Sequence, residues 1–223
     1  PIYKIASFEI TDIPLLRYVA STGKPILIST GLSSKIEISS AINAIKLVSE
    51  SPILLFHCIS NYPAKLINSN LSLIKTLQNT FDLPVGLSDH TIGNQAAKIA
   101  TSLGACAIEK HFTLDRNDKG PDSSFSMEPL ELKQMKQELN ETWKAMGNGK
   151  FERTKSEQLN KIFRRSIYFV KDLNAGEVIN RTHIRRIRPG FALDPKNFED
   201  LFGKKVKKNV KFGDRVTWDL ISK

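Results

Sequence analysis

The sequence is poor in cysteine and contains no long apolar run, and both features exclude classes of protein. Its two cysteines, Cys58 and Cys106, lie in apolar stretches, so we expect two reduced core thiols rather than a disulfide framework. No apolar stretch approaches the ~20 residues of a membrane-spanning helix, and no signal peptide is visible. These absences predict a cytoplasmic protein that does not enter a membrane.

The composition supports a folded core but leaves the partner open. With 40% hydrophobic residues, 223 residues form one large domain or two smaller ones. The net charge of +10, much of it after residue 150, suits nucleic acid or an anionic small molecule. Few aromatic residues interleave with the basic ones, and the lysines from Lys204 to Lys211 are typical of a protected sheet edge. We therefore expect no nucleic acid partner and keep a basic nucleic-acid-binding module as the alternative.

Apolar strands alternate with amphipathic helices over the first two thirds of the chain. The predicted strands are centred near Ile5, Leu27, Leu55, Leu87 and Ala107, and a helix follows each. Continuous apolar strands that alternate with helices predict a parallel sheet covered by helices. Five such units are too few to close an eight-stranded barrel. They form either an open doubly wound sheet or the last five strands of a TIM (β/α)8 barrel.

Helix caps and apolar faces refine this prediction. Ser34 and Glu37 form a capping box at the start of one helix, Asn70 is expected to cap a second, and Pro129 starts a third. The expected buried faces are Ile38, Ala41, Ile42, Ile45 and Val48 in the first of these helices, and Leu132, Met135, Leu139, Trp143 and Met146 in the third. We place the fifth strand on the apolar run from Ala105 to Ile108.

The pattern changes from Phe151 onwards. Thr154 and Glu157 open a short helix that ends near Phe163. Short strands are then expected at Ser166–Val170, Ile184–Ile187, Val206–Val210 and Val216–Ile221. Short strands with closely spaced turns predict a small β-rich module. A domain boundary therefore falls between about residues 147 and 164.

Two histidines follow consecutive predicted strands at the same end. His90 comes after the fourth strand, and His111 comes after the fifth, directly behind Glu109 and Lys110. A buried strand seldom ends in ionisable residues for packing reasons alone, because each charge needs water, a partner or a metal. Two imidazoles at matching strand ends favour Mn, Fe, Co or Zn over Mg. The alternative is two unrelated structural histidines, the role that we expect for His57 in its apolar strand.

Further polar residues follow the other strands at this edge. Lys4, Ser7, Ser29 and Ser88 supply cationic and hydroxyl donors that suit a phosphate. Glu9 could be functional, either as an acid–base group or by holding a substrate hydroxyl. The alternative is a solvated carboxylate with no role in the site. For three other charged residues at this edge, the alternative to a role in the site is a salt-bridged rim; they are Asp89, Lys110 and Asp115.

Several of these motifs together resemble the sialic acid synthase family. They are Lys4-Ile5-Ala6-Ser7-Phe8-Glu9, Ser29-Thr30-Gly31, Gly86-Leu87-Ser88-Asp89-His90-Thr91, Glu109-Lys110-His111-Phe112-Thr113 and Gly120-Pro121-Asp122. Arg188-Pro189-Gly190 and Leu201-Phe202-Gly203-Lys204 resemble the SAF (antifreeze-like, β-clip) domain of that family. Phe8 and the residues that follow Gly120 are most similar to the pseudaminic acid synthase branch, and N-acetylneuraminate or legionaminate synthesis is the alternative.

The resemblance implies a condensation of phosphoenolpyruvate with an open-chain acetamido sugar, which gives a nine-carbon 2-keto acid and phosphate. The roles it implies are metal ligands for His90 and His111, phosphoenolpyruvate contacts for Lys4, Ser7, Ser29 and Ser88, a catalytic position for Glu9, and sugar contacts for Tyr62 and Asp122. The implied metal is Mn2+, Mg2+ or Co2+. Arg188 is expected to reach the partner's substrate in a domain-swapped homodimer.

The same resemblance gives the expected architecture. Residues 1–147 are expected to be the last five βα units of a TIM barrel, 148–164 a linker with a short helix, and 165–223 a SAF domain. Because the family barrel begins with three further strands, the chain resembles a family member truncated at its N-terminus. We therefore expect this chain by itself to be inactive.

Overall fold

The computed structural model describes residues 1–222, so Lys223, the last residue of the predicted SAF module, lies outside the described residues. The chain divides into two compact units, Pro1–Gly149 and Lys150–Lys223, and each is described by itself. The charge divides with them. Residues 150–223 contain nineteen Lys and Arg against nine Asp and Glu, whereas residues 1–149 contain fourteen of each. The whole excess of +10 therefore belongs to the second unit.

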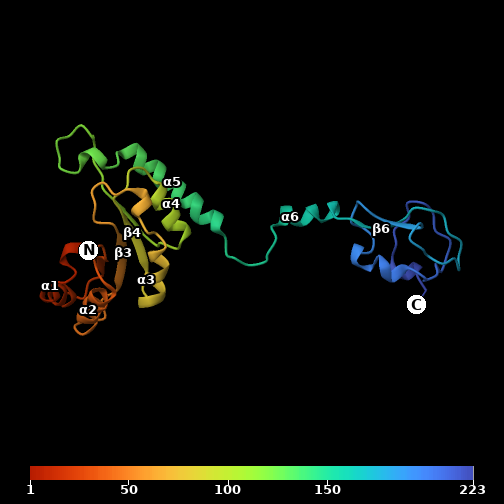
Figure 1. Ribbon diagram of the computed structural model, residues 1–223, viewed down its shortest axis with the longest axis horizontal. Coiled ribbons are helices and arrows are strands. Elements are labelled where there is room, and N and C mark those ends of the chain that lie inside the picture. Colours follow the sequence, from red (N-terminus) through yellow and green to blue (C-terminus); the bar gives the residue numbers. More distant parts are fainter. Residues whose placement is uncertain (223) are drawn as a thin grey trace. The chain divides into compact units, whose positions relative to one another are not determined.

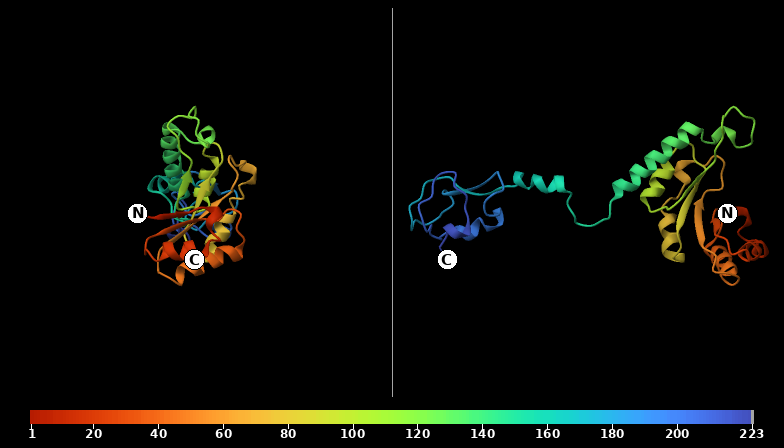
Figure 2. Two further views of the ribbon diagram at one scale, coloured as in Figure 1. Left: turned by 90° about the vertical axis from the view of Figure 1, so that its left-hand side faces the viewer. Right: turned by 180° about the vertical axis from the view of Figure 1, so that it is seen from behind.

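The first unit is built on a parallel five-stranded sheet. Its strands are β1 (Tyr3–Ile5), β2 (Ile26–Ser29), β3 (Ile53–Cys58), β4 (Val85–Asp89) and β5 (Ile108–Lys110), and neighbours in the sheet are neighbours in the chain. The helices between and after them are α1 (Ile13–Ala20), α2 (Lys35–Lys46), α3 (Leu73–Phe81), α4 (Gln95–Ser102) and α5 (Pro129–Met146). The sheet curls, with the helices along its outer side (Figures 1 and 2). A doubly wound sheet reverses its strand order at a switch point, so the unbroken order confirms the partial barrel.

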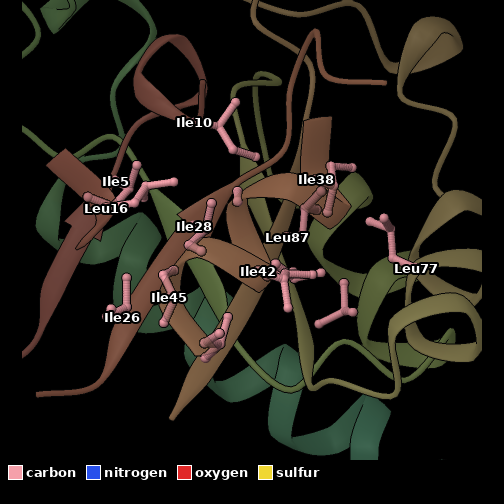
Figure 3. Close-up of a cluster of buried hydrophobic side chains, with 14 of the residues drawn as sticks. Ile5, Ile10, Leu16, Ile26, Ile28, Ile38, Ile42, Ile45, Leu77 and Leu87 are labelled. Carbon is pink, nitrogen blue, oxygen red and sulfur yellow. The ribbon is translucent and has the colours of Figure 1, made fainter. Parts of the chain in front are cut away.

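Side chains of the strands alternate between a helix-covered face and an inner face. The buried aliphatic residues Ile26, Ile28, Leu55 and Leu87 belong to one continuous core with residues from α1 to α4 (Figure 3). His57 shares this face and is buried, as predicted, with its Nε2 donating to the backbone oxygen of Ser69 over 2.7 Å. The inner face carries the polar residues considered below.

The caps of two helices show one correct prediction and one error. Ser34 and Glu37 form the predicted capping box of α2, whose backbone and side-chain bonds are both present. Val48 was predicted to be buried with this helix, but α2 ends at Lys46 and Val48 is exposed. Asn70 was predicted to cap α3, but that helix begins at Leu73 and Asn70 precedes it in a left-handed conformation.

The prediction for β5 and α5 was wrong in three respects. The strand begins at Ile108 rather than Ala105, although the preceding segment already bonds to β4 through the Cys106 amide. Cys106 is exposed rather than buried. Along α5 only Met135 of the predicted core face is fully buried, whereas Trp143 is 68% exposed and Met146 is also exposed. Within residues 1–222, β5 pairs with β4 alone, which leaves this side of the sheet without a neighbour.

An apolar groove of about 750 Å3 runs between α5 and the segment that leads into β5. It is lined mainly by Ala105, Cys106, Ile108, Phe112, Leu132, Met135, Leu139 and Trp143. The predicted core face of α5 is therefore apolar as expected but largely uncovered. The opposite edge strand, β1, also has a single neighbour in the part of the chain that the structure describes.

The second unit contains less regular strand structure than predicted. After α6 (Lys155–Leu159), β6 (Ser166–Phe169) pairs antiparallel with β7 (Ile184–Ile187). The segments predicted as strands at 206–210 and 216–221 make isolated bridges instead. The unit has its own core, which includes Ile167, Phe169, Ile179, Ile184, Leu201, Val206, Val210 and Val216.

Seven 3-10 helices complete the described chain: Ser7–Glu9, Leu66–Asn68, Ser123–Phe125, Asn160–Phe163, Pro195–Asn197, Glu199–Leu201 and Trp218–Leu220. No helix of residues 1–222 combines the length and the apolar character needed to cross a membrane.

Because each unit has its own core, a core truncation should destabilise only the unit that contains it. We expect Phe169→Ala to lower the free energy of unfolding of the second unit by about 3–5 kcal/mol. Hydrogen exchange followed by mass spectrometry should show the loss of protection in β6 and β7, with β3 unchanged. An equal loss of protection in β3 would contradict two separate cores.

Burial of His57 should make the first unit sensitive to acid. Burial lowers the pKa of His57 from 6.5, partly offset by its bond to Ser69. The unfolded chain therefore binds a proton at a higher pH than the folded chain, so stability is full above pH 6.5 and falls as the pH drops towards the folded pKa. Denaturant titrations of His57→Gln between pH 4.5 and 7.5 should show a shallower pH dependence than those of the wild type or His183→Gln. Identical slopes would refute this assignment.

Candidate active site

The carboxyl ends of β4 and β5 place four functional side chains on the inner face of the sheet. Ser88 pairs in register with Glu109, and Asp89 pairs with Lys110. Because side chains alternate along a strand, Ser88 and Glu109 share the inner face with the histidines that come two residues later. The Ser88 hydroxyl donates to Glu109 Oε1 over 2.7 Å and lies 3.3 Å from His90 Nε2.

The two histidines are brought together as predicted. The ring centroids of His90 and His111 are 5.3 Å apart with an interplanar angle of 67°. His90 is buried, and burial lowers the pKa of His90, with the neighbouring His111 acting in the same direction. The His90 imidazole is therefore neutral near pH 7.

The hydrogen bonds of His90 fix its tautomer. Nδ1 lies 2.7 Å from the backbone oxygen of Ile59, and because a carbonyl only accepts, Nδ1 must carry the proton. The single hydroxyl proton of Ser88 is directed to Glu109, so it does not occupy Nε2. The Nε2 lone pair of His90 is thus available on the inner face. A backbone carbonyl behind Nδ1 is the usual support of a metal-ligating histidine.

A second cluster lies beside the histidines. Lys4 Nζ donates to Ser29 Oγ over 2.8 Å and lies 3.5 Å from Glu109 Oε1. Glu109 therefore connects Lys4 with Ser88, and through Ser88 with His90. One ammonium group and two buried hydroxyls give this part of the site the donors that an anionic oxygen group requires.

Gly31 leaves room for a third group of polar atoms. A Cβ atom at this position would lie 2.4 Å from Ser60 Oγ, 2.7 Å from Cys58 Sγ and 2.9 Å from Ser7 Oγ. The Ser7 hydroxyl contacts the Cys58 thiol at 3.0 Å, and the Ser60 hydroxyl is buried without a hydrogen-bond partner among residues 1–222. Glycine is required here because any side chain would displace these three groups.

Aromatic rings and one carboxylate form the wall of the site next to the histidines. The Tyr62 ring lies 4.3 Å from the His90 ring and 5.7 Å from that of His111, measured between centroids. Phe125 lies 5.2 Å from the His111 ring and 6.2 Å from the Tyr62 ring, so the three rings form one cluster. Asp122 Oδ2 is 3.4 Å from His111 Nδ1. Burial raises the pKa of the Tyr62 hydroxyl, so it is protonated near neutral pH.

Asp89 and Lys110 form a buried ion pair. The sequence had also suggested an exposed salt-bridged rim for these residues. The distance from Lys110 Nζ to Asp89 Oδ2 is 2.8 Å, and the two side chains are 3% and 1% exposed. The pair lies on the helix-covered face, behind the histidines. The third residue of the expected rim, Asp115, bonds locally to Asn117.

Within residues 1–149, neither Ser7 nor Glu9 makes a hydrogen bond that joins it to the histidines. Glu9 is exposed, and its carboxylate accepts from its own loop at the Ala6 amide over 2.9 Å. Arg188 is exposed and belongs to the second unit.

Glu109 and Phe125 are the residues that sequence reasoning missed as parts of the site. Glu109 was predicted only as a charged strand end, although it lies two residues before His111 and therefore on the same face. That period-2 spacing was the available signal. Phe125 belongs to a 3-10 turn outside the strand pattern, and its one sequence signal was its place in the motif that follows Gly120.

The two imidazoles are the residues best placed to hold a metal ion. Within residues 1–222 no group of three or more His, Cys, Asp and Glu side chains is arranged to hold one. The free lone pair of His90 Nε2 and its carbonyl support nevertheless fit a ligand role, and an incomplete protein shell leaves positions open to substrate oxygens.

Comparison with known proteins identifies the family of both units. A model described as the NeuB family matches residues 1–151, and one described as the SAF domain matches residues 164–222. The chain is 38% identical over 214 residues to a pseudaminic acid synthase of Campylobacter jejuni, and 40% identical over 213 residues to an N,N'-diacetyllegionaminic acid synthase of the same organism. These alignments cover 96% and 94% of this chain but 62% and 64% of the two relatives.

A solved structure agrees with the sequence matches. The N-acetylneuraminic acid (sialic acid) synthetase of Leptospira borgpetersenii, solved in complex with citrate, is 41% identical and superposes with a TM-score of 0.68. The superposition covers 71% of this chain and 55% of that protein. The chain thus spans less than two thirds of the length of the relatives named here. Because the family model covers more than half of the chain, the chain belongs to the NeuB family and has a SAF domain after its partial barrel.

Proposed function

We propose that the protein condenses phosphoenolpyruvate with an open-chain acetamido sugar to give a nonulosonic acid and phosphate. The observation that carries this proposal is the meeting of the His90 and His111 rings with the Lys4–Ser29 and Ser88–Glu109 contacts on one face. Formation of the carbon–carbon bond needs stabilisation of negative charge on the aldehyde oxygen, and phosphoenolpyruvate needs fixed donors for its anionic groups. The two neighbouring clusters supply both requirements.

In this proposal His90 and His111 hold a divalent ion, Mn2+, Mg2+ or Co2+. When bound, the ion would polarise the sugar aldehyde. The chain's own residues prepare this site in two ways. The Ile59 carbonyl keeps the proton of His90 on Nδ1, so that Nε2 stays available, and Tyr62 stacks on His90 and restricts the ring.

We assign the phosphoenolpyruvate subsite to Lys4, Ser7, Ser29 and Ser88. Lys4 is already oriented by Ser29, and its side chain is partly exposed, so that a ligand could reach the ammonium and replace its longer contacts to Ile5 and Glu109. Tyr62 and Asp122, which contact the histidines, are assigned to the sugar. Glu9 is assigned a catalytic role near the reacting carbons, which requires its carboxylate to leave the Ala6 amide that it now caps.

For the sugar we propose a 2,4-diacetamido-trideoxy hexose, which makes the product pseudaminic acid. The support is the Phe8 and Gly120 motif pattern together with pseudaminic acid synthases among the relatives. A legionaminic acid synthase is equally similar, so the second candidate is the sugar whose condensation gives N,N'-diacetyllegionaminate as the product. Phosphate release assayed with each sugar separates the two, and release with N-acetylmannosamine alone would contradict both.

We further propose that the full-length protein works as a homodimer in which the SAF domain of one subunit covers the barrel mouth of the other. Exposed apolar side chains follow every strand at the mouth, at Phe8, Leu32, Ile67, Ile92 and Leu114. Such a rim is typical of a surface that a partner covers. Arg188 would contribute to the partner's site. Because β1 and β5 each pair with only one strand in the described residues, residues 1–223 alone are proposed to be inactive.

Removal of either imidazole should strongly weaken divalent ion binding. With two protein ligands, loss of one should weaken Mn2+ binding by at least about 100-fold, beyond the 10–100-fold typical of outer-shell changes. Calorimetric titration of His90→Ala and His111→Ala with Mn2+ measures this effect. His183→Ala is the matched control, since it removes a histidine from the second unit. Wild-type affinity in either site variant would exclude the proposed metal site.

Loss of the Lys4 cluster should affect one substrate and spare the other. We expect Lys4→Met and Ser29→Ala in the native enzyme to raise KM for phosphoenolpyruvate at least about tenfold, because a charge-assisted hydrogen bond is worth about 1.5–3 kcal/mol. KM for the sugar should change little. Lys24→Met, which removes an ammonium that lies over Tyr3 on the β1 edge, provides the control. An increase confined to the sugar KM would reverse the assignment of the two subsites.

A further inference from the structure

A closed set of hydrogen bonds surrounds the buried pair of Asp89 and Lys110. Asp89 Oδ2 accepts from Lys110 Nζ over 2.8 Å, and Oδ1 accepts from the amide and the hydroxyl of Thr91 over 2.8 and 2.7 Å. Lys110 Nζ also donates to the Thr91 backbone oxygen. Both oxygens of the carboxylate are thus occupied, and the ammonium has two acceptors. Every one of these atoms belongs to just three residues.

These three residues flank the two histidines. Asp89 and Thr91 lie on either side of His90 in the chain, and Lys110 directly precedes His111. Asp89 and Lys110 are also opposite each other in the register of β4 and β5. The bond from Asp89 Oδ1 to the Thr91 amide closes a turn around His90, and the ion pair ties that turn to the end of β5. The backbone at His90 and at His111 is therefore held in place from the helix-covered side of the sheet.

Stability alone does not account for a pair so deeply buried. The side chains are 3% and 1% exposed, so both charges have lost their water. Replacing a buried ion pair with apolar residues of similar size is often neutral or stabilising, because desolvation offsets the attraction. Such a pair instead specifies geometry, because its hydrogen bonds form only when the two strand ends adopt one relative arrangement.

We propose that the Asp89–Lys110 pair, with Thr91, is a positioning device that sets the spacing of the His90 and His111 rings for a shared divalent ion. The inference rests on the proposed metal role of the histidines. None of the three residues touches the ion or the substrates. They act through the backbone on the 5.3 Å separation of the two rings.

The test compares an apolar double variant with a polar one. Asp89→Leu/Lys110→Met removes both charges and all their bonds, whereas Asp89→Asn/Lys110→Gln removes the charges but keeps donors and acceptors. We expect the apolar variant to melt within a few degrees of the wild type yet to bind Mn2+ about 10–100-fold more weakly, as is typical of outer-shell changes. The polar variant should recover most of that affinity.

A second measurement is independent of the metal. In the metal-free protein, nuclear Overhauser contacts between the ring protons of His90 and His111 should be present in the wild type and lost in the apolar variant. The matched control is Lys98→Met/Glu138→Leu, which removes a partly exposed ion pair of 3.0 Å in the same unit and should alter neither measurement.

The outcomes separate this inference from the proposed function. An apolar variant that is folded, keeps the ring contacts and binds Mn2+ with wild-type affinity would overturn the positioning role. A wild type that binds no divalent ion but loses its ring contacts in the variant would remove the metal role and support the positioning role. If the apolar variant does not fold, Thr91→Val decides: it removes one hydroxyl bond to Asp89 and should weaken Mn2+ binding about 3-fold or more, and unchanged affinity would overturn the inference.

Discussion

The register between β4 and β5 is the constraint on which the rest of the site depends. Parallel pairing sets Ser88 opposite Glu109 and Asp89 opposite Lys110, and alternation then sends one pair to the inner face and the other to the helix layer. A shift of one residue in either strand would turn that strand's side chains to the opposite face. The Ser88 hydroxyl or the Glu109 carboxylate would then enter the core, and one member of the ion pair would enter the site without its partner. The chemistry of the inner face and the packing of the outer face are therefore specified by the same backbone bonds.

Within that frame, the reactivity of the site follows from where protons are held. Glu109 accepts a hydrogen bond from the Ser88 hydroxyl, and the Ile59 carbonyl accepts one from Nδ1 of His90. Burial keeps the imidazole of His90 neutral. The result is a lone pair in a position from which water is largely excluded, beside an ammonium that remains partly exposed.

The sequence predicted those features that depend on residues close together in the chain. It predicted less well those that depend on packing against a distant segment. The capping box at Ser34 and the meeting of His90 with His111 follow from short-range spacing, and both were predicted correctly. Trp143 and Cys106 were expected in the core because they are apolar and correctly spaced, yet the groove that they line is uncovered in the described chain. In the second unit, isolated bridges replace two expected strands, since periodicity does not reveal how many bonds a short segment makes. Glu109 shows the remaining gap: its spacing was visible, but its partner Lys4 lies 105 positions away in the chain.

The division of charge between the units has a colloidal consequence. The barrel unit is balanced in acidic and basic residues, and it exposes an apolar rim and two open sheet edges. A particle with those properties and little net charge has weak electrostatic repulsion from its own kind and tends to associate. The SAF unit, with its excess of ten positive charges, supplies that repulsion for the whole chain. Because this repulsion is electrostatic, it weakens as added salt shortens the screening length, and the balanced barrel unit then has little to keep its copies apart.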